Sequence, residues 1–487
     1  MTASSSHRRR AAWLCVLAAG ASGCAPNIAL APTPAVSSGE WRAARSPLAA
    51  ASVDTGWAAF GSPTLNGLIA RARAANTDVR VATARIVQAR GDLKVARSAS
   101  LPTVVAAASA GALTGGDGEL FDRRDEALGL DVAYELDLFG YAKAGSRSAR
   151  ARLAASGHDR DAVALAVESD VARAFFQFSA LSGQLDLLGR ALDNARELDR
   201  IIGVRVREGI ATRYDSGLQA VEVTRIETEI SRLAEARDRT RNALAVLVGE
   251  EAPSFDVEAD ALTTLAPPMF APSQPAELVS RRPDVRAAEA RIAAANGDVA
   301  RARAAFLPGL RISAGAIFEG AAGGPVGLAL STGSSLLASI FDGGRLKGNL
   351  LSAGGAQQEA AETYRKALLV SLADAEDAMT GLDRSRHREM LLRETLSIAH
   401  ETARIARRQY VEGAADLQMV LDAERNALDV ENAHILAVQD RLNAAVDLFK
   451  AVGGHPVATP GAIAGQARPP EDATPPSLTS SGRGSGS

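Results

Sequence analysis

Two stretches of the chain carry an apolar residue at every third or fourth position over an unusual length. In residues 141–207 one such face consists of Val163, Val167, Val171, Phe175, Phe178, Leu181, Leu185, Leu188 and Leu192. This spacing predicts a single α-helix, which extends about 100 Å at about 1.5 Å per residue. Residues 345–410 form a second stretch of similar length, and neither stretch contains proline, the strongest helix breaker.

A short break and a second helical pattern follow each long stretch. Glycine, the usual residue just past a helix C-terminus, occurs in both breaks, as Gly209 and as Gly413. The helical pattern then resumes over residues 215–248 and 417–452. We therefore expect two long antiparallel helical hairpins, one in each half of the chain.

Shorter segments alternate between apolar residues and small or polar ones, which is the pattern of a β-strand with two different faces. The clearest is residues 127–138, and residues 103–112, 309–318 and 327–340 alternate more weakly. Strands of about 9–11 residues with one apolar face fit a transmembrane barrel that has lipid outside and water inside. Two amphipathic hairpins covering a soluble core are the alternative.

Four strands are too few to enclose a pore. An open sheet edge inside a bilayer leaves backbone N–H and C=O groups without hydrogen-bond partners, because hydrocarbon offers none. If these strands lie in a membrane, several copies of the chain must therefore combine to close the sheet.

The second half of the chain repeats the first. Residues 78–102 and 284–308 are identical at 15 of 25 aligned positions, an offset of 206, and the resemblance continues at an offset of 204, at which Gly209 aligns with Gly413. A long internal repeat indicates that one structural unit occurs twice. Each unit is expected to contain a short helix, a strand hairpin and a long helical hairpin.

The N-terminus has the pattern of an export signal. Three arginines, at positions 8–10, precede an apolar run that is too short to span a bilayer. The following Ala-Ser-Gly-Cys resembles the lipobox of bacterial lipoproteins, which makes Cys24 the expected site of lipid attachment, and by the same resemblance Ala25 favours sorting to the outer membrane. Such a lipid tethers a chain without spanning the membrane. An ordinary signal peptide that contains a cysteine is the alternative.

These patterns divide the chain into five parts. We expect a signal peptide over residues 1–23, a lipidated linker over 24–56, a first repeat over 57–265, a second repeat over 266–455 and a disordered tail over 456–487. The tail is assigned from its content of Pro, Ser and Gly.

Composition and motifs argue against several classes of function. A net charge of −3 and a pI of about 6.2 disfavour a nucleic-acid partner, which requires a basic face. The sequence has no P-loop, no HExxH and no GxGxxG that opens a helix after a strand, and its six histidines lack metal-ligand spacing. We expect no enzymatic activity, no cofactor and no metal site.

Several short motifs carry a more specific signal. They are RRPDVR at 281–286, AAFLP at 304–308, YELDLFG at 134–140, FDGGR at 341–345 and VGG at 452–454. Together they resemble the outer-membrane lipoprotein factors of resistance-nodulation-division (RND) efflux systems, the NodT and TolC-like family. The resemblance covers about residues 57–455.

This resemblance implies a homotrimer. Each protomer would contribute four strands to a twelve-stranded transmembrane β-barrel and its long helical hairpins to a trimeric α-barrel across the periplasm. The implied partners are a periplasmic adaptor protein and an inner-membrane RND-type transporter, and the implied activity is passive conduction of small molecules out of the cell. The alternatives are a duct for ABC-driven protein secretion, a periplasmic adaptor and a lipid-anchored helical envelope scaffold.

The turns at the ends of the helical hairpins hold the candidate functional residues. Asp215 and Asp416 lie in or beside them, and threefold repetition would place rings of carboxylates around a narrow opening, where they attract cations. The alternative is that either aspartate only caps the returning helix. The residues expected to contact the adaptor lie in the same turns and are Gly209, Thr212, Gly413 and Ala414.

Overall fold

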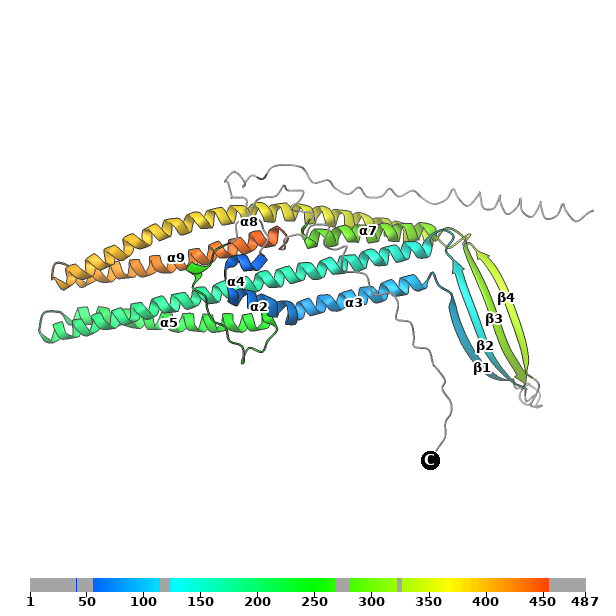
Figure 1. Cartoon of the computed structure of the whole chain (residues 1–487), viewed down its shortest axis with the longest axis horizontal. Coiled ribbons are helices and arrows are strands. Elements are labelled where there is room, and N and C mark those ends of the chain that lie inside the picture. Colours follow the sequence, from blue (N-terminus) through cyan, green and yellow to red (C-terminus); the bar gives the residue numbers. More distant parts are fainter. Residues whose placement is uncertain (1–40, 42–55, 114–122, 268–280, 322–325, 455–487) are drawn as a thin grey trace, which may run out of the picture.

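The chain folds into an elongated molecule with a β-sheet at one end and two helical hairpins at the other (Figure 1). This computed structural model describes residue 41 and residues 56–113, 123–267, 281–321 and 326–454. The expected signal peptide, Cys24 and the tail from 456 to 487 lie outside the described residues.

Two helices of 67 residues each form the body of the molecule. They are α4 (Tyr141–Arg207) and α8 (Arg345–Val411), and each is followed by an antiparallel partner, α5 (Arg213–Val248) or α9 (Leu417–Ala451). Among the described helices, none combines the length and the apolarity needed to cross a bilayer.

Shorter helices precede the sheet and lie along the long ones. These are η3 (Gly56–Phe60), α2 (Pro63–Ala75), α3 (Thr77–Ser98), η4 (Leu262–Thr264) and α7 (Pro283–Ala304). The segments that are similar in sequence form α3 and α7, each of 22 residues and each leading directly into a strand. The two halves therefore have the same order of elements from this helix onward.

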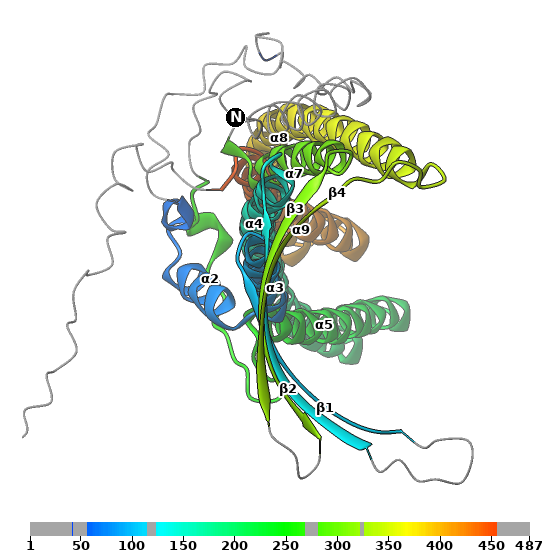
Figure 2. The same ribbon diagram turned by 90° about the vertical axis from the view of Figure 1, so that its right-hand side faces the viewer.

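The four strands form one antiparallel sheet in sequence order. They are β1 (Thr103–Leu113), β2 (Arg123–Leu136), β3 (Gly309–Ala321) and β4 (Gly327–Leu337), so β1 and β4 are the edges. Figure 2 shows that the sheet is curved.

Several expected boundaries were wrong by a few residues. Strand β2 ends at Leu136 rather than at 138, because the Asp137 carboxylate accepts hydrogen bonds from the backbone N–H groups of Ala142 (3.2 Å) and Lys143 (2.8 Å) and so belongs to the start of α4. Strands β1 and β3 continue to Leu113 and Ala321 instead of 112 and 318.

The remaining differences lie at β4 and at the returning helices. Strand β4 ends at Leu337 rather than at 340, because residues 338–340 pair with no strand among the described residues. Helix α5 begins at Arg213 instead of 215, since Thr212 is its N-cap. Helix α8 ends one residue later than expected and α9 one residue earlier.

The strand register places apolar residues on one face of the sheet and polar or small residues on the other. Leu130 pairs with Ala106 and Ala316, and Phe318 pairs with Leu128 and Leu328, so all of these side chains share one face. The opposite face carries Asp131, Glu135, Arg311, Ser313 and Ser331. The apolar face is uncovered in the single chain, with Leu330 exposed by 76%.

The main hydrophobic core lies midway along the helices, where α4 and α9 meet η3 and α2. Phe60, Phe175, Phe176 and Phe449 are fully buried there. The buried Glu168 carboxylate accepts hydrogen bonds from the Trp57 indole (2.7 Å) and from the Arg73 guanidinium, so the buried charge is compensated. This core fixes the short N-terminal helices to the long ones.

We expect Gly249→Ala to destabilise this middle region. Gly249 ends α5 at a φ of +76°, and a Cβ there would lie 2.4 Å from the carbonyl oxygen of Ala75. The left-handed backbone alone costs about 1–2 kcal/mol for a non-glycine residue, and the clash adds to it. The measurement is thermal unfolding of the detergent-solubilised protein by circular dichroism.

The matched control is Gly67→Ala. Gly67 is exposed within α2, and a Cβ there meets no described atom within 4 Å. Alanine should leave stability unchanged or raise it by up to about 1 kcal/mol through its helix propensity. Equal melting temperatures for the two variants would contradict the role assigned to Gly249.

Candidate functional site

The end of the molecule farthest from the sheet consists of two turns with the same backbone hydrogen bonds. Gly209 and Gly413 take positive φ values of +74° and +77°. The residue after each glycine donates its N–H to a carbonyl of the preceding helix, Ile210 to Arg205 and Ala414 to Gln409, both at 2.8 Å. These glycine-terminated ends satisfy the last carbonyls of α4 and α8.

Both candidate aspartates serve as caps of the returning helices. The Asp215 carboxylate accepts from the N–H and the hydroxyl of Thr212, both at 2.8 Å, while the Asp215 N–H donates to the Thr212 hydroxyl, which is a capping box. The Asp416 carboxylate accepts from the N–H of Met419 at 2.8 Å and caps α9. The capping role is thus present, and a gating role remains a hypothesis.

Large apolar side chains are exposed around these turns. Ile210 and Tyr214 are exposed by 74% and 72%, and Val411 and Met419 are also exposed. Exposed apolar surface gathered at one end of a helical body is typical of a protein-binding site. The expected contact residues Gly209, Thr212, Gly413 and Ala414 all lie in the same two turns, and all four are exposed. The exposure of Val411 and Met419 could not be predicted from the sequence, because both residues belong to regular helical patterns.

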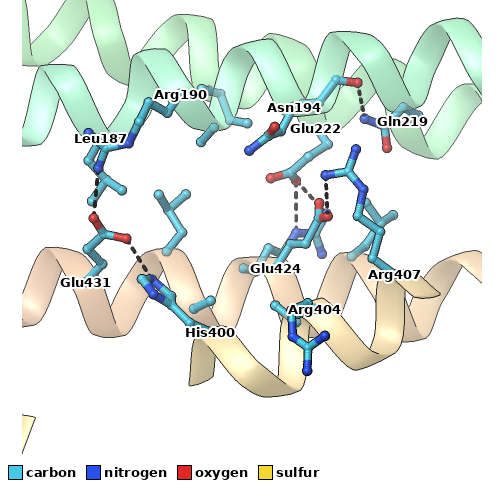
Figure 3. Close-up of a pocket in the computed structure, with 18 residues that line it drawn as sticks. Leu187, Arg190, Asn194, Gln219, Glu222, His400, Arg404, Arg407, Glu424 and Glu431 are labelled. Carbon is cyan, nitrogen blue, oxygen red and sulfur yellow. Dashed lines mark hydrogen bonds and ion pairs between the residues drawn. The ribbon is translucent and has the colours of Figure 1, made fainter. Parts of the chain in front are cut away.

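A cavity of about 360 Å³ lies between the α4/α5 hairpin and the α8/α9 hairpin (Figure 3). It is on the sheet side of the two turns, which we call the tip of the molecule. Its walls carry both charged and apolar side chains. Glu431 of α9 pairs there with Arg190 of α4 and with His400 of α8, at 2.9 Å each. The Gln219 side-chain amide N–H donates to the Ala195 carbonyl at 2.7 Å and so connects α5 to α4.

Glu222 links the two hairpins. Its side chain is only 7% exposed, and its carboxylate accepts from Arg225 of its own helix at 2.6 Å and from Arg425 of α9 at 2.7 Å. Burial alone raises the pKa of Glu222, but the hydrogen bonds from the two guanidinium groups outweigh that effect and bring the pKa below its ordinary value. Glu222 therefore stays charged and holds α5 against α9.

Glu424 is in the opposite electrostatic situation. Burial raises the pKa of Glu424 above its ordinary value, and the nearby Glu222 charge raises it further. Arg407 offsets this only in part, because its guanidinium lies 3.6 Å from the Glu424 carboxylate. The cavity thus contains one carboxylate stabilised in its charged form and one whose surroundings favour its neutral form.

Sequence analysis did not find this cluster. Glu222 and Arg425 lie 203 positions apart on different helices, and each reads as an ordinary charged residue on a helix surface. Across the described part of the chain, no group of three or more His, Cys, Asp or Glu side chains is placed to hold a metal ion. Cys24 cannot be placed, since it lies outside the described residues.

A long helical body that ends in a sheet with one apolar face is an architecture of channels rather than of soluble globular proteins. Residues 68–250 and 275–454 match the family described as "Outer membrane efflux protein". The chain belongs to this family, and is an efflux channel of the outer membrane.

Curated relatives agree with this assignment. The pyoverdine export outer membrane protein OpmQ of Pseudomonas aeruginosa is 33% identical over 421 residues, which cover 82% of this chain and 86% of the relative. The toluene efflux pump outer membrane protein TtgF of Pseudomonas putida is 28% identical, with 81% and 84% covered. The probable outer membrane lipoprotein SilC of Salmonella typhimurium is 26% identical, with 82% and 88% covered.

Solved structures show the same fold. The outer-membrane channel OprN superposes with a TM-score of 0.78 at 26% identity and covers 88% of this chain and 98% of its own. The open state of the Neisseria gonorrhoeae MtrE outer membrane channel gives a TM-score of 0.77 at 26% identity, with 88% and 97% covered. The mostly helical architecture with four antiparallel strands is therefore shared with TolC-like efflux channels.

We expect neutralising Glu222 and Glu424 to change stability in opposite directions at neutral pH. Glu222→Gln should lower it by about 1–3 kcal/mol, because two guanidinium groups lose a charged acceptor. Glu424→Gln should raise the melting temperature, because it removes a charge that burial disfavours. The measurement is thermal unfolding of the purified protein from neutral pH down to well below the ordinary carboxyl pKa.

The pH dependence separates the two effects. Glu222 has a lowered pKa, so its stabilisation is present above the ordinary carboxyl pKa and is lost as pH falls through the lowered value. Glu424 has a raised pKa, so its ionisation destabilises the fold progressively as pH rises from the ordinary carboxyl pKa to the raised value, and the gain in its variant grows over that interval and is constant above it. Glu401→Gln, which breaks an exposed pair with Arg404, is the control and should leave stability almost unchanged, because exposed ion pairs are screened by water and salt. A parallel shift of all three variants at every pH would contradict this assignment.

Proposed function

We propose that this chain is the outer-membrane channel of a tripartite efflux system. It conducts small molecules passively after an inner-membrane RND-type transporter delivers them through a periplasmic adaptor. The observation that carries the proposal is the open four-stranded sheet, apolar on one face, joined directly to helices about 100 Å long. Such a chain is built to reach from a membrane to partners far from it.

Closure of the sheet requires further copies of the chain. The outer edges of β1 and β4 pair with no strand among the described residues, and unpaired edges are not tolerated in hydrocarbon. A homotrimer joins four strands from each copy into a twelve-stranded barrel, with the apolar face toward lipid. Asp131, Glu135 and Arg311 then face the water-filled interior.

Lipid attachment at Cys24 completes the proposed placement in the outer membrane. The lipobox-like sequence supports it, as does the printed name of the relative SilC, which describes a probable lipoprotein. The anchor and the barrel then hold the protein to the same membrane, and the helical hairpins extend into the periplasm with their turns farthest from that membrane.

The turns are the proposed adaptor-binding surface. Ile210, Tyr214 and Met419 supply exposed apolar area there, next to Gly209, Thr212, Gly413 and Ala414. The cargo is proposed to be small molecules, because OpmQ and TtgF are named for the export of pyoverdine and toluene. No observation favours the protein-secretion duct or the envelope scaffold over this function.

The direct test is the assembly and conductance of the purified protein. We expect a species of three chains from native outer membranes and discrete conductance steps when it is inserted into planar bilayers, because only a closed barrel gives a continuous aqueous path. Protein that remains a single chain in the outer membrane, or that never conducts under any voltage or salt, would refute the proposed function.

A second experiment tests whether the tip aspartates also control ion passage. In the double variant Asp215→Asn and Asp416→Asn, the amide oxygen at position 416 can still cap α9, since Asn is as good an N-cap as Asp. The amide oxygen at position 215 can still accept from the Thr212 N–H. The charge alone is removed, so we expect lower selectivity for cations over anions in planar bilayers and altered single-channel conductance.

The control for the tip variant is Glu251→Gln. Glu251 is an exposed residue just after α5, at the end of that helix farther from the turns. The Glu251→Gln variant should therefore have the same ion selectivity and conductance as the unmodified protein. If the double variant also matched the unmodified protein, Asp215 and Asp416 would be helix caps without a gating role.

A further inference from the structure

The cavity between the two hairpins has the size and the accessibility of a small-molecule site. Its volume of about 360 Å³ falls within the roughly 300–1,000 Å³ of pockets that bind small ligands. Helices α4, α5, α8 and α9 all contribute to its walls, and Arg190, His400 and Arg404 in its lining are exposed to solvent. A ligand can therefore reach the cavity from outside while both hairpins stay folded.

The negative groups of the cavity lie deeper than the positive ones. Its three carboxylate side chains are exposed by 29% at most, and its four guanidinium side chains by 36% at least. The carboxylates belong to Glu222, Glu424 and Glu431, and the guanidinium groups to Arg190, Arg404, Arg407 and Arg425. The interior thus offers hydrogen-bond acceptors, while the charged donors of the chain lie closer to solvent.

One of the interior acceptors has no donor. Gln219 is fully buried, and its amide N–H donates to the Ala195 carbonyl at 2.7 Å, which sets the orientation of the amide. Its oxygen Oε1 points away from α4 and accepts no hydrogen bond within the described part of the chain (Figure 3). Buried polar atoms are nearly always hydrogen-bonded, so this oxygen requires a donor that the described residues do not supply.

Glu424 is a second acceptor whose bonding is incomplete. Each of the other two carboxylates has two basic partners at 2.9 Å or less, whereas Arg407 lies 3.6 Å from Glu424, which is too far for a hydrogen bond. Arg407 is also shared with Glu197, whose pKa is lowered first by a hydrogen bond from Arg200 and further by the Arg407 charge. The carboxylate of Glu424 is therefore open to a second, better-placed cation.

These two acceptors define the chemistry of the missing donor. A primary ammonium group has three N–H donors and one positive charge, so it can satisfy the Gln219 oxygen and the Glu424 carboxylate together. Water can donate to Gln219 but cannot neutralise Glu424, and an anion would meet acceptors where it needs donors. Apolar side chains that include Leu187, Ile226 and Leu428 line other parts of the cavity. They favour an aliphatic chain attached to the ammonium group.

We propose that this cavity binds a short aliphatic primary amine in its ammonium form. The ammonium group donates to the Gln219 oxygen and to the Glu424 carboxylate, and Arg407 turns away from Glu424. The aliphatic chain lies against Leu187 and Leu428. Because Gln219 belongs to α5 and Glu424 to α9, the bound amine connects the two hairpins of one chain. This site goes beyond the proposed function, since it requires neither a second copy of the chain nor conduction.

Calorimetric titration of the purified protein in a non-ionic detergent tests the site. Butylammonium chloride should bind saturably, with one site per chain, after the heat of titration into detergent alone is subtracted. Butyltrimethylammonium chloride has the same butyl chain and the same charge but no N–H donor. It should bind at least about tenfold more weakly, because the hydrogen bonds to Gln219 and Glu424 are lost.

Two substitutions should weaken the binding of butylammonium, and a third should strengthen it. Glu424→Gln removes the charge and Gln219→Met removes the acceptor, so each should lower the affinity by about tenfold or more. Arg407→Met removes the competing guanidinium group and should raise the affinity. The matched control is Glu235→Gln, because Glu235 is an exposed carboxylate of α5 that pairs with Arg239 outside the cavity. It should bind butylammonium as the unmodified protein does.

The outcomes separate this inference from the proposed function. Circular dichroism checks that each variant retains its helices, and the comparison of the two ammonium probes requires no substitution. Absence of saturable butylammonium binding, equal affinity for the quaternary probe, or undiminished affinity in Glu424→Gln would overturn the site. None of these results bears on the number of chains or on conductance in planar bilayers, which test the channel function separately.

Discussion

Every feature of this protein depends on the backbone hydrogen bonds that a single chain leaves unmade at the edges of its sheet. Strands β1 and β4 each present one unpaired edge within the described chain, and the face that joins them is mostly apolar. Exposing the apolar face to water is unfavourable, and the unpaired backbone groups of the two edges find no hydrogen-bond partners in hydrocarbon. Closure with further strands inside a membrane would satisfy both requirements, which is the physical basis for proposing that several copies of the chain share one barrel.

The helices continue this arrangement away from the sheet without a flexible joint. At both exits from the sheet an aspartate turns directly into a helix: Asp137 caps the start of α4, and Asp342 accepts from the N–H groups of Gly344 and Leu346, both at 2.9 Å, at the start of α8. The lowered pKa of Asp342, caused first by the Leu346 N–H, keeps that cap charged. Strand direction therefore sets helix direction. Farther out, the hairpins hold together through the buried aromatic core and, near the tip, through Glu222 and its arginines.

Much of this fold follows from periodicity alone. A spacing of three to four over residues 141–207 predicts the whole of α4, and alternation predicts where the strands lie. The errors occur where one side chain competes with the pattern. Asp137 alternates correctly for a strand but is taken up by the helix that follows, and residues 338–340 alternate correctly but have no strand to pair with in the described part of one chain. At the site, the turns, their glycines and the capping role of the aspartates were accessible from sequence. The cavity was not, because its pairs join residues that only the packing of two distant hairpins brings together.

The turns at the tip have a consequence for how such a protein diversifies. Each turn is completed by its own hydrogen bonds, from the glycine-terminated end of one helix to the capped start of the next. These local bonds define the backbone of both turns, while Tyr410 and Leu417 beside the second turn pack into a small core with residues of α4. Substitutions at outward positions such as Ile210 or Tyr214 can therefore leave the distant sheet unaffected, so the proposed partner-binding surface can diversify between lineages while the opposite end of the molecule is inherited unchanged.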